Sequence, residues 1–127
     1  MIGGVVNAAG LAEVELLIRG SSGRDLLTMA MIDTGFTGDM TITKADIEVL
    51  QLDVVGTRRG ELANGEFVLF TVYRAIAKWH GGDQEIAVIE SNSGSLLGMS
   101  LLQGCRLTID VICGGNVNVA PLPIASS

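Results

Sequence analysis

The sequence predicts an all-β fold in a single domain, residues 1–127, and three observations support this fold class. Short runs of alternating apolar and polar residues are typical of strands with one buried face. Clusters of Gly, Ser, Asn and Asp separate these runs, as turns do. Only one longer stretch, 44–52, has the apolar spacing of an amphipathic helix. At 127 residues the chain is long enough to bury a hydrophobic core.

The first half of the chain predicts a β-hairpin, a short strand and a helix. The hairpin consists of Glu13–Arg19 and Leu26–Ile32, which are joined by the turn formers of 20–25. A short strand, Met40–Ile42, precedes the helix Lys44–Leu52. The Thr43 hydroxyl can accept a backbone N–H at the start of that helix, so we expect Thr43 to be its N-cap.

The second half predicts a long hairpin. Its arms are Asp53–Leu62 and Phe67–Trp79, and the tip contains Asn64-Gly65, a strong short-range hairpin signal. A strand over 84–89 follows, then a short helix over 100–104 that begins after Leu96-Leu97-Gly98. The last predicted strands are Cys105–Ile112 and Asn116–Val119.

Composition and charge limit the partners. Apolar residues make up 48% of the chain and charged residues only 17%, so polar surface is scarce and we expect some surface to be shared between subunits. The net charge is −6 and the basic residues are scattered, which argues against a nucleic acid partner.

Cysteine and histidine usage predicts no metal site. The chain has two cysteines, Cys105 and Cys113, but no Cys-x-x-Cys, and His80 is its one histidine. These are too few soft ligands for a zinc site, so we expect neither a metal nor a cofactor. Two reduced thiols fit a cytoplasmic location. The N-terminus, 1–6, lacks the basic segment of a signal peptide, and no apolar run approaches the roughly 20 residues of a membrane span. We therefore expect a cytoplasmic protein with no membrane partner.

The apolar strand over 26–32 ends in Asp33-Thr34-Gly35. A carboxylate in this position needs stabilising neighbours or an opening to a cleft. By itself the tripeptide is also typical of an Asx turn that closes a strand.

Three features therefore stand in order: the strand ending in Asp33-Thr34-Gly35, the hairpin tipped by Asn64-Gly65, and Leu96-Leu97-Gly98 leading into a short helix. Together they resemble a retropepsin-like aspartic protease, and most closely the small single-domain bacterial members related to retroviral proteases. The resemblance covers 12–119. It implies an acid-protease half-barrel with a psi-loop, one helix after the catalytic loop and a short helix after Leu-Leu-Gly.

The resemblance also implies a homodimeric aspartic endopeptidase. Aspartic proteolysis needs two carboxylates that share one proton and activate a water molecule between them. This chain has one Asp-Thr-Gly, so the second Asp33 would come from a symmetry-related copy. The implied catalytic residues are Asp33, Thr34, which would hydrogen-bond to the partner's loop, and Gly35, which leaves room for a peptide or protein substrate.

For substrate binding, the resemblance implies a flap over 62–67 and contacts from the loop after Gly35. The implied residues are Phe36, Thr37, Asp39, Ala63, Asn64, Gly65 and Glu66. The flap has only one glycine, and Glu66 is unusual beside an apolar cleft. These two departures leave open an alternative, a catalytically inactive binding or dimerisation module with the same fold. A dimer that assembles only on substrate also stays open.

Two further expectations concern residues outside this constellation. Trp79 and His80 are expected to be packing or surface residues, because the chain has no Gly-x-Ser-x-Gly pattern for a histidine-assisted nucleophile. The segments 1–9 and 116–119 are candidates for the dimer interface, since the termini form it in retroviral enzymes; the sequence leaves this open.

Overall fold

The computed structural model describes residues 2–123, which form strands and two short helices; Met1 and 124–127 of the predicted domain lie outside the described residues. The strands are β1 (Ile2–Val6), β2 (Ala12–Arg19), β3 (Asp25–Ile32), β4 (Met40–Ile42), β5 (Asp53–Glu61), β6 (Phe67–Trp79), β7 (Gly82–Glu90), β8 (Leu96–Leu97), β9 (Cys105–Ile109) and β10 (Asn116–Pro121). The helices are α1 (Lys44–Leu50) and α2 (Met99–Leu102). The all-β prediction is therefore confirmed.

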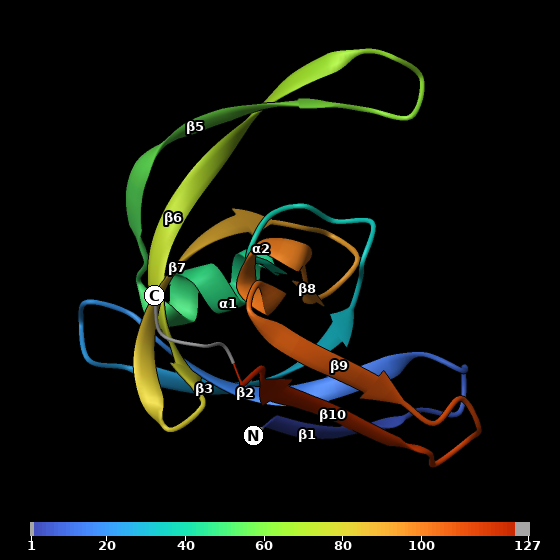
Figure 1. Ribbon diagram of the computed structural model, residues 1–127. Helices are drawn as coiled ribbons and strands as arrows, with labels where there is room; N and C mark the ends of the chain where they lie inside the picture. The colour runs from blue at the N-terminus through green and yellow to red at the C-terminus, as the bar shows by residue number, and fades with distance from the viewer. Residues whose placement is uncertain (1, 124–127) are drawn as a thin grey trace.

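All strands belong to one 10-stranded sheet in the order β5-β6-β7-β4-β8-β3-β2-β1-β10-β9. In addition β6 pairs with β2, through Ile18↔Ala77 and Arg19↔Ile76, so the strands from β2 to β6 in this order form a closed ring of neighbours. Strands β1, β10 and β9 extend the sheet beyond this ring as a separate layer (Figure 1).

The core lies inside the ring and continues to the buried side chains of β1 and β10, and the alternation in β2 shows why. Val14, Leu16 and Ile18 are at most 2% exposed, whereas the intervening residues face outward. The alternation in the sequence, which puts Val14, Leu16 and Ile18 on one face, predicts such a half-buried strand. Helix α1 closes the core with Ile47 and Leu50.

Local signals set the start and the end of α1. The Thr43 hydroxyl accepts a hydrogen bond from the Asp46 N–H (3.3 Å), which confirms the predicted N-cap. The predicted end at Leu52 is wrong, because Gln51 adopts a left-handed conformation (φ 52°) and its N–H bonds back to Ile47 and Glu48. A non-glycine residue in this conformation gives little warning in the sequence.

The predicted strand Cys105–Ile112 is too long. Strand β9 ends at Ile109, and the chain then turns, with the Ile112 N–H bonded to the Asp110 carbonyl. Any Cβ on Gly115 would overlap the Asp110 carbonyl, so glycine permits this tight return. The turn leaves Ile112 mostly exposed although the alternating pattern continued through it.

Strand β1 was not predicted, because glycines interrupt its short apolar run. Gly4 approaches β2 so closely that any Cβ would overlap the Glu13 backbone, and this permits the pairing Gly4↔Val14. Strand β1 lies between β2 and β10, and β10 lies between β1 and β9. Both edges of these two strands are therefore used within one chain.

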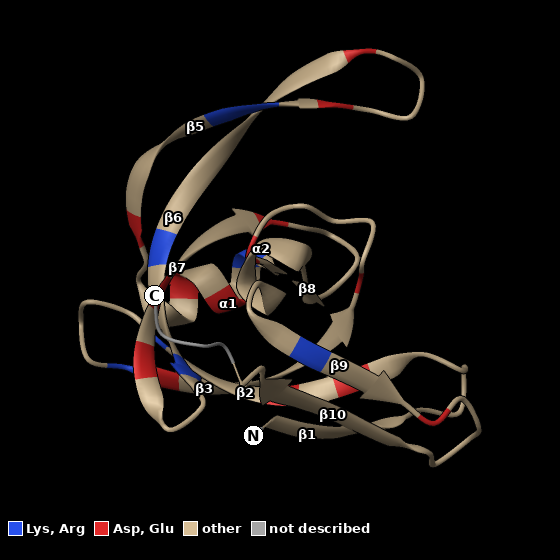
Figure 2. Ribbon diagram, viewed as in Figure 1, with Lys and Arg blue, Asp and Glu red and all other residues tan. Residues whose placement is uncertain are grey.

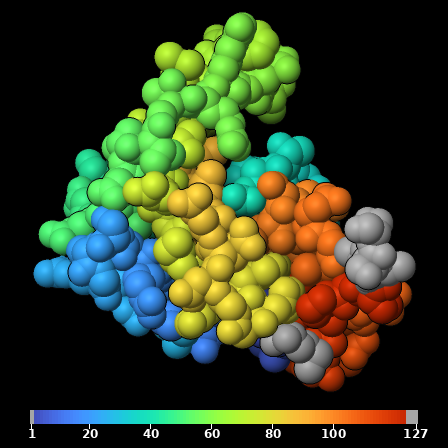
Figure 3. Space-filling model, turned by 60° about the vertical axis from the view of Figure 1, so that its left-hand side comes forward, coloured from blue at the N-terminus to red at the C-terminus, as the bar shows by residue number. Residues whose placement is uncertain are grey.

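The β5–β6 hairpin projects from the body of the molecule and curves over it (Figure 1). At its tip Gly65 has φ +86°, and the Asn64 side chain accepts a hydrogen bond from the Glu66 N–H (3.0 Å). The space-filling view shows the hairpin, in green, overhanging the teal surface of the segment that follows β3 (Figure 3).

Candidate active site

Asp33 follows directly after β3, at a crossing of three strands. Strand β8 lies between β3 and β4, parallel to β3 through Ile32↔Leu97 and antiparallel to β4 through Met40↔Leu97. The Asp33 N–H donates to the Leu97 carbonyl (3.0 Å) and extends the β3–β8 pairing into the loop. The psi-shaped crossing that the resemblance implied is thus present.

The segment after β8 holds the Asp33 loop from behind. The Met99 N–H donates to the Phe36 carbonyl (2.8 Å), and the Gly98 N–H donates to the Asp39 carbonyl (2.9 Å). Any Cβ on Gly98 would overlap the carbonyl oxygens of Phe36 and Gly38. Glycine at position 98 therefore lets the two backbones run in direct contact.

The loop fixes one oxygen of the Asp33 carboxylate. The Gly35 N–H donates to Asp33 Oδ1 (2.9 Å), and the Phe36 N–H donates to the Asp33 carbonyl (3.1 Å). The hydrogen bonds of residues 2–123 include none to Asp33 Oδ2 or to the Thr34 hydroxyl. Asp33 is half-buried, whereas Thr34 and Gly35 are exposed.

A cleft of about 490 Å³ lies between this loop and the stem of the hairpin. The loop and β4 form one side, the β5 and β6 stem forms another, and the end of β7 completes the wall. The lining residues are Gly35, Phe36, Thr37, Thr41, Arg58, Arg59, Gly60, Glu61, Phe70, Ile89, Glu90 and Ser91.

The structure brings some of the predicted site residues together. Asp33 to Thr37 form one continuous loop, and its members Gly35, Phe36 and Thr37 line the cleft. The tip residues Ala63, Asn64, Gly65 and Glu66 are exposed, and the stem rather than the tip borders the cleft.

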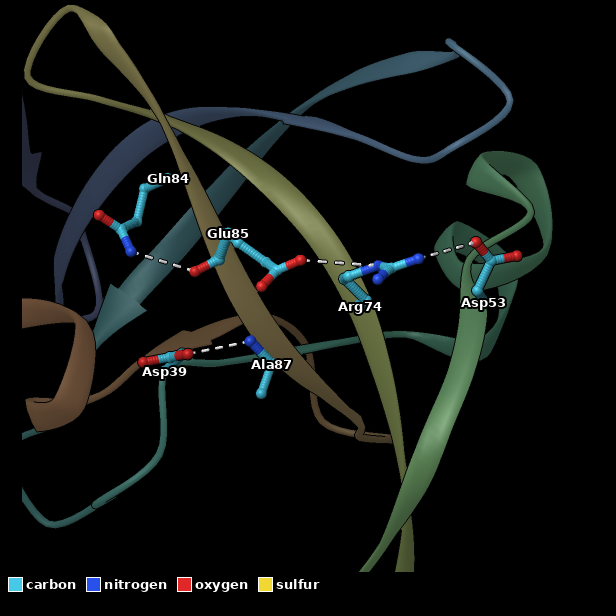
Figure 4. A network of polar contacts seen from close by, with 6 residues as sticks. All are labelled: Asp39, Asp53, Arg74, Gln84, Glu85 and Ala87. Carbon is cyan, nitrogen blue, oxygen red and sulfur yellow. Dashed lines mark hydrogen bonds and ion pairs between the residues drawn. The ribbon is translucent and has the colours of Figure 1, made fainter.

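Asp39 lies apart from the cleft. Its carboxylate accepts a hydrogen bond from the Ala87 N–H (2.9 Å) and borders a separate cavity of about 370 Å³ (Figure 4). On the far side of that cavity, Arg74 lies within ion-pair distance of Asp53 and Glu85, 3.8 and 3.7 Å away. The Asp39 carboxylate thus fastens the end of the loop to β7.

Sequence reasoning missed the cleft residues of β5, β6 and β7, chiefly Arg58, Phe70 and Glu90. Two adjacent arginines in one arm of a hairpin were the available signal. Alternation places them on opposite faces, but it does not say which face meets the Asp33 loop.

Trp79 and His80 lie at the β6–β7 turn. Their rings pack edge to face, with centroids 4.8 Å apart, and His80 Nε2 lies 3.3 Å from Cys105 Sγ. Burial lowers the pKa of His80 and raises the pKa of the Cys105 thiol, so both groups favour their neutral forms. The side chains of Trp79 and His80 thus pack against each other, as expected for packing residues.

Within residues 2–123, no group of three or more His, Cys, Asp or Glu side chains could hold a metal ion. No helix in the described part of the chain is long and apolar enough to span a membrane.

The strand order, the psi-shaped crossing and the Asp33 loop together define an acid-protease type of architecture. The crystal structure of a retropepsin-like aspartic protease from Rickettsia conorii matches 94% of this chain and 91% of its own, with a TM-score of 0.54 and 19% sequence identity. No known family model matches the chain, and no curated protein matches it in sequence. The chain therefore has a retropepsin-like fold, as the sequence predicted.

Proposed function

We propose that this protein is a homodimeric aspartic endopeptidase that hydrolyses peptide bonds between two Asp33 carboxylates, one from each subunit. The observation that carries the proposal is the position of Asp33 at the psi-shaped crossing of a retropepsin-like fold. One of its carboxylate oxygens is fixed by Gly35, and the other makes no hydrogen bond with residues 2–123.

The chemistry follows from two carboxylates with one proton. The ionised Asp33 accepts a proton from water while the water oxygen bonds to the carbonyl carbon of the substrate. The protonated Asp33 donates its proton to the carbonyl oxygen. The Asp33 that took the proton from water then donates it to the amide nitrogen, while the other Asp33 takes a proton from a hydroxyl of the diol, so that the carbon–nitrogen bond breaks and the shared proton is restored. The two carboxylates share a proton because like charges about 3 Å apart cannot both ionise.

Two features support assembly with a second copy. Thr34 is exposed, and its hydroxyl is available to hydrogen-bond with the partner's loop. Within residues 2–123, strand β9 is an end strand of the sheet and pairs with β10 alone, which leaves its other edge free. Since β1 and β10 already use both edges within the chain, β9 is the part of the terminal layer that can still add a strand.

The β5–β6 hairpin acts as the flap in this proposal. Its stem borders the cleft, where Gly60 and Phe70 line the side that can cover a bound peptide. Residues Ala63, Asn64, Gly65 and Glu66 close over the substrate, while Phe36 and Thr37 contact it from below. Asp39 contributes indirectly, by holding the loop against β7.

The test replaces Asp33 with asparagine, which keeps an oxygen to accept the Gly35 N–H but cannot act as base or acid. Asp33→Asn should lower kcat/KM for an extended peptide library by at least about 100-fold. The same measurement on Asp110→Asn, an exposed aspartate outside the site, should give the wild-type value. Circular dichroism and sedimentation show whether each variant keeps its fold and assembly.

A folded Asp33→Asn variant with wild-type kcat/KM would refute the proposed mechanism. If the wild-type protein cleaves no peptide from acidic to neutral pH, the inactive binding module becomes the better description.

A further inference from the structure

The wall of the cleft formed by β5 carries a cation that faces the Asp33 loop. Arg58 Nη1 lies 3.3 Å from the point that a Cβ on Gly38 would occupy. Phe70, the cross-strand neighbour of Arg58, lays its ring against Gly60. Since Arg58 and Gly60 are two residues apart in one strand, they share the face of the hairpin that meets the loop.

The adjacent arginine alternates to the opposite face of the strand. Arg59 borders the cleft as well, but its guanidinium lies 3.9 Å from the centroid of the Phe67 ring and is engaged in a cation–π contact. Figure 2 shows the basic band of these two residues partway along the β5 arm, with acidic residues nearer the tip.

The Arg58 guanidinium has no ionic partner within residues 2–123. The ion pairs of the described chain use Arg19, Arg74 and Lys78 as their cations. Glu61 and Glu90 line the same cleft, but neither lies within ion-pair distance of Arg58. Glu61 shares the strand face of Arg59 instead.

The surroundings of Arg58 favour a particular ligand. A guanidinium presents a planar array of N–H donors that fits the two oxygens of a carboxylate. Phe36 and Phe70, which are half-buried, and the buried Ile89 supply apolar walls beside it. A side chain with a short aliphatic stem and a terminal carboxylate would match both parts of this wall.

We infer that Arg58 is a specificity-determining residue that binds a carboxylate side chain of the substrate peptide. The inference rests on the proposed function and adds a substrate class to it, peptides with a glutamate or aspartate close to the scissile bond. The carboxylate belongs to a side chain because an extended peptide passes through the cleft between the hairpin and the loop.

The experiment compares pairs of amidated peptides that differ only in having Glu or Gln at one position near the cleaved bond. At one position the wild-type protein should prefer Glu over Gln by about tenfold in kcat/KM, as expected for one charged hydrogen-bonding contact in a partly exposed cleft. Arg58→Gln should abolish this preference mainly through KM, and Arg58→Glu should shift it toward Lys. Arg24→Gln removes the same charge from an exposed turn between β2 and β3, outside the cleft, and should keep the preference for Glu.

Peptides with a free C-terminal carboxylate identify the source of the recognised group. A preference that follows the C-terminal carboxylate rather than the side chain would overturn the inference. So would cleavage by the wild-type protein without any preference for Glu, or an Arg58→Gln variant that retains it. In each of these three cases the proposed protease activity would stand.

If the wild-type protein cleaves none of the peptides, the proposed function fails, and binding then decides the role of Arg58. Fluorescence anisotropy of labelled, amidated Glu and Gln peptides should show tighter binding of Glu to the wild-type protein. Equal binding of the two peptides, or an unchanged difference in Arg58→Gln, would overturn the inference.

Discussion

At the scale of single residues, the backbone of the Asp33 loop depends on the lack of a side chain at Gly98. Gly98 is buried directly behind the loop, where its missing side chain allows the backbone of 98–100 to bond to Phe36, Gly38 and Asp39. Its own backbone is extended (φ −104°, ψ 178°), so glycine is needed here for space and not for an unusual dihedral angle. This contact therefore supports from behind the loop that carries Asp33.

Gly98→Ala should lower the free energy of unfolding by about 1–3 kcal/mol, the usual penalty for overpacking a close contact. The added methyl would overlap the carbonyl oxygens of Phe36 and Gly38. Urea unfolding followed by circular dichroism measures the change.

Gly3→Ala is the matched control, because Gly3 is an exposed glycine in β1 with open space at its Cβ position. Its unfolding midpoint should match that of the wild-type protein. Equal midpoints for Gly98→Ala and Gly3→Ala would contradict the steric role assigned to Gly98.

At the scale of elements, the long strand pairing of the β5–β6 hairpin lets it extend over the molecule, and one glycine forms the turn at its tip. Pairing runs from Asp53↔Arg74 to Glu61↔Phe67, with one irregularity between Val54 and Gly56. The Asn-Gly signal predicted that both residues tolerate positive φ, but only Gly65 adopts it. Asn64 instead stabilises the turn through its side chain.

Gly65→Ala should strain the tip of the hairpin by about 1 kcal/mol, since an L-residue at φ +86° is disfavoured. The free energy of unfolding in urea should fall by that amount. If the hairpin is the flap, kcat/KM for a peptide substrate should fall as well.

Gly56→Ala changes the same hairpin at a glycine with ordinary φ and open space around it, so both quantities should stay at their wild-type values. A fall in stability for Gly56→Ala as large as that for Gly65→Ala would mean that positive φ is not the reason for the glycine at the tip.

At the scale of the whole molecule, one chain supplies half of the proposed active site. Each strand of the closed ring has a neighbouring strand on both edges, and so do β1 and β10. Directly after β9, the Asp110 N–H donates a hydrogen bond to the Asn116 carbonyl of β10, so by alternation the N–H groups of Leu107 and Ile109 in β9 point toward the free edge. A second copy can therefore add to the sheet at β9 without displacing a strand.

If the active form is a dimer, the rate per subunit should fall on dilution, in parallel with the loss of the dimer in sedimentation. Backbone amides of β9 should exchange hydrogen more slowly as the protein concentration rises, because pairing would protect the free edge. Amides of β2, which is paired on both sides, provide the internal reference.

A rate per subunit that stays constant at concentrations where sedimentation shows only monomers would rule out catalysis by a pair of Asp33 residues. A dimer seen only in the presence of peptide would indicate assembly on substrate.

Local patterns in the sequence determined most of the elements. Alternation identified the inward face of β2, the bounds of β4 and β6 were predicted as they occur, and Thr43 marked the start of α1. Asp33-Thr34-Gly35 and Leu96-Leu97-Gly98 also determined the resemblance, and with it the retropepsin-like fold. These features depend on residues that are neighbours in sequence, so the sequence alone was enough.

Tertiary structure decided what depends on contacts between distant segments. Strand β1 can pair with β2 because Gly4 fits against the Glu13 backbone. The carboxylate of Asp39 accepts a hydrogen bond from the Ala87 N–H of β7, which is distant in sequence. The end of β9 at Ile109 depends on a turn that returns to β10. Alternation placed Arg58 and Arg59 on opposite faces of β5 but did not say which one lies against the loop at Gly38. The curvature of the hairpin over the loop settled that, because it arises from the pairing of the whole sheet.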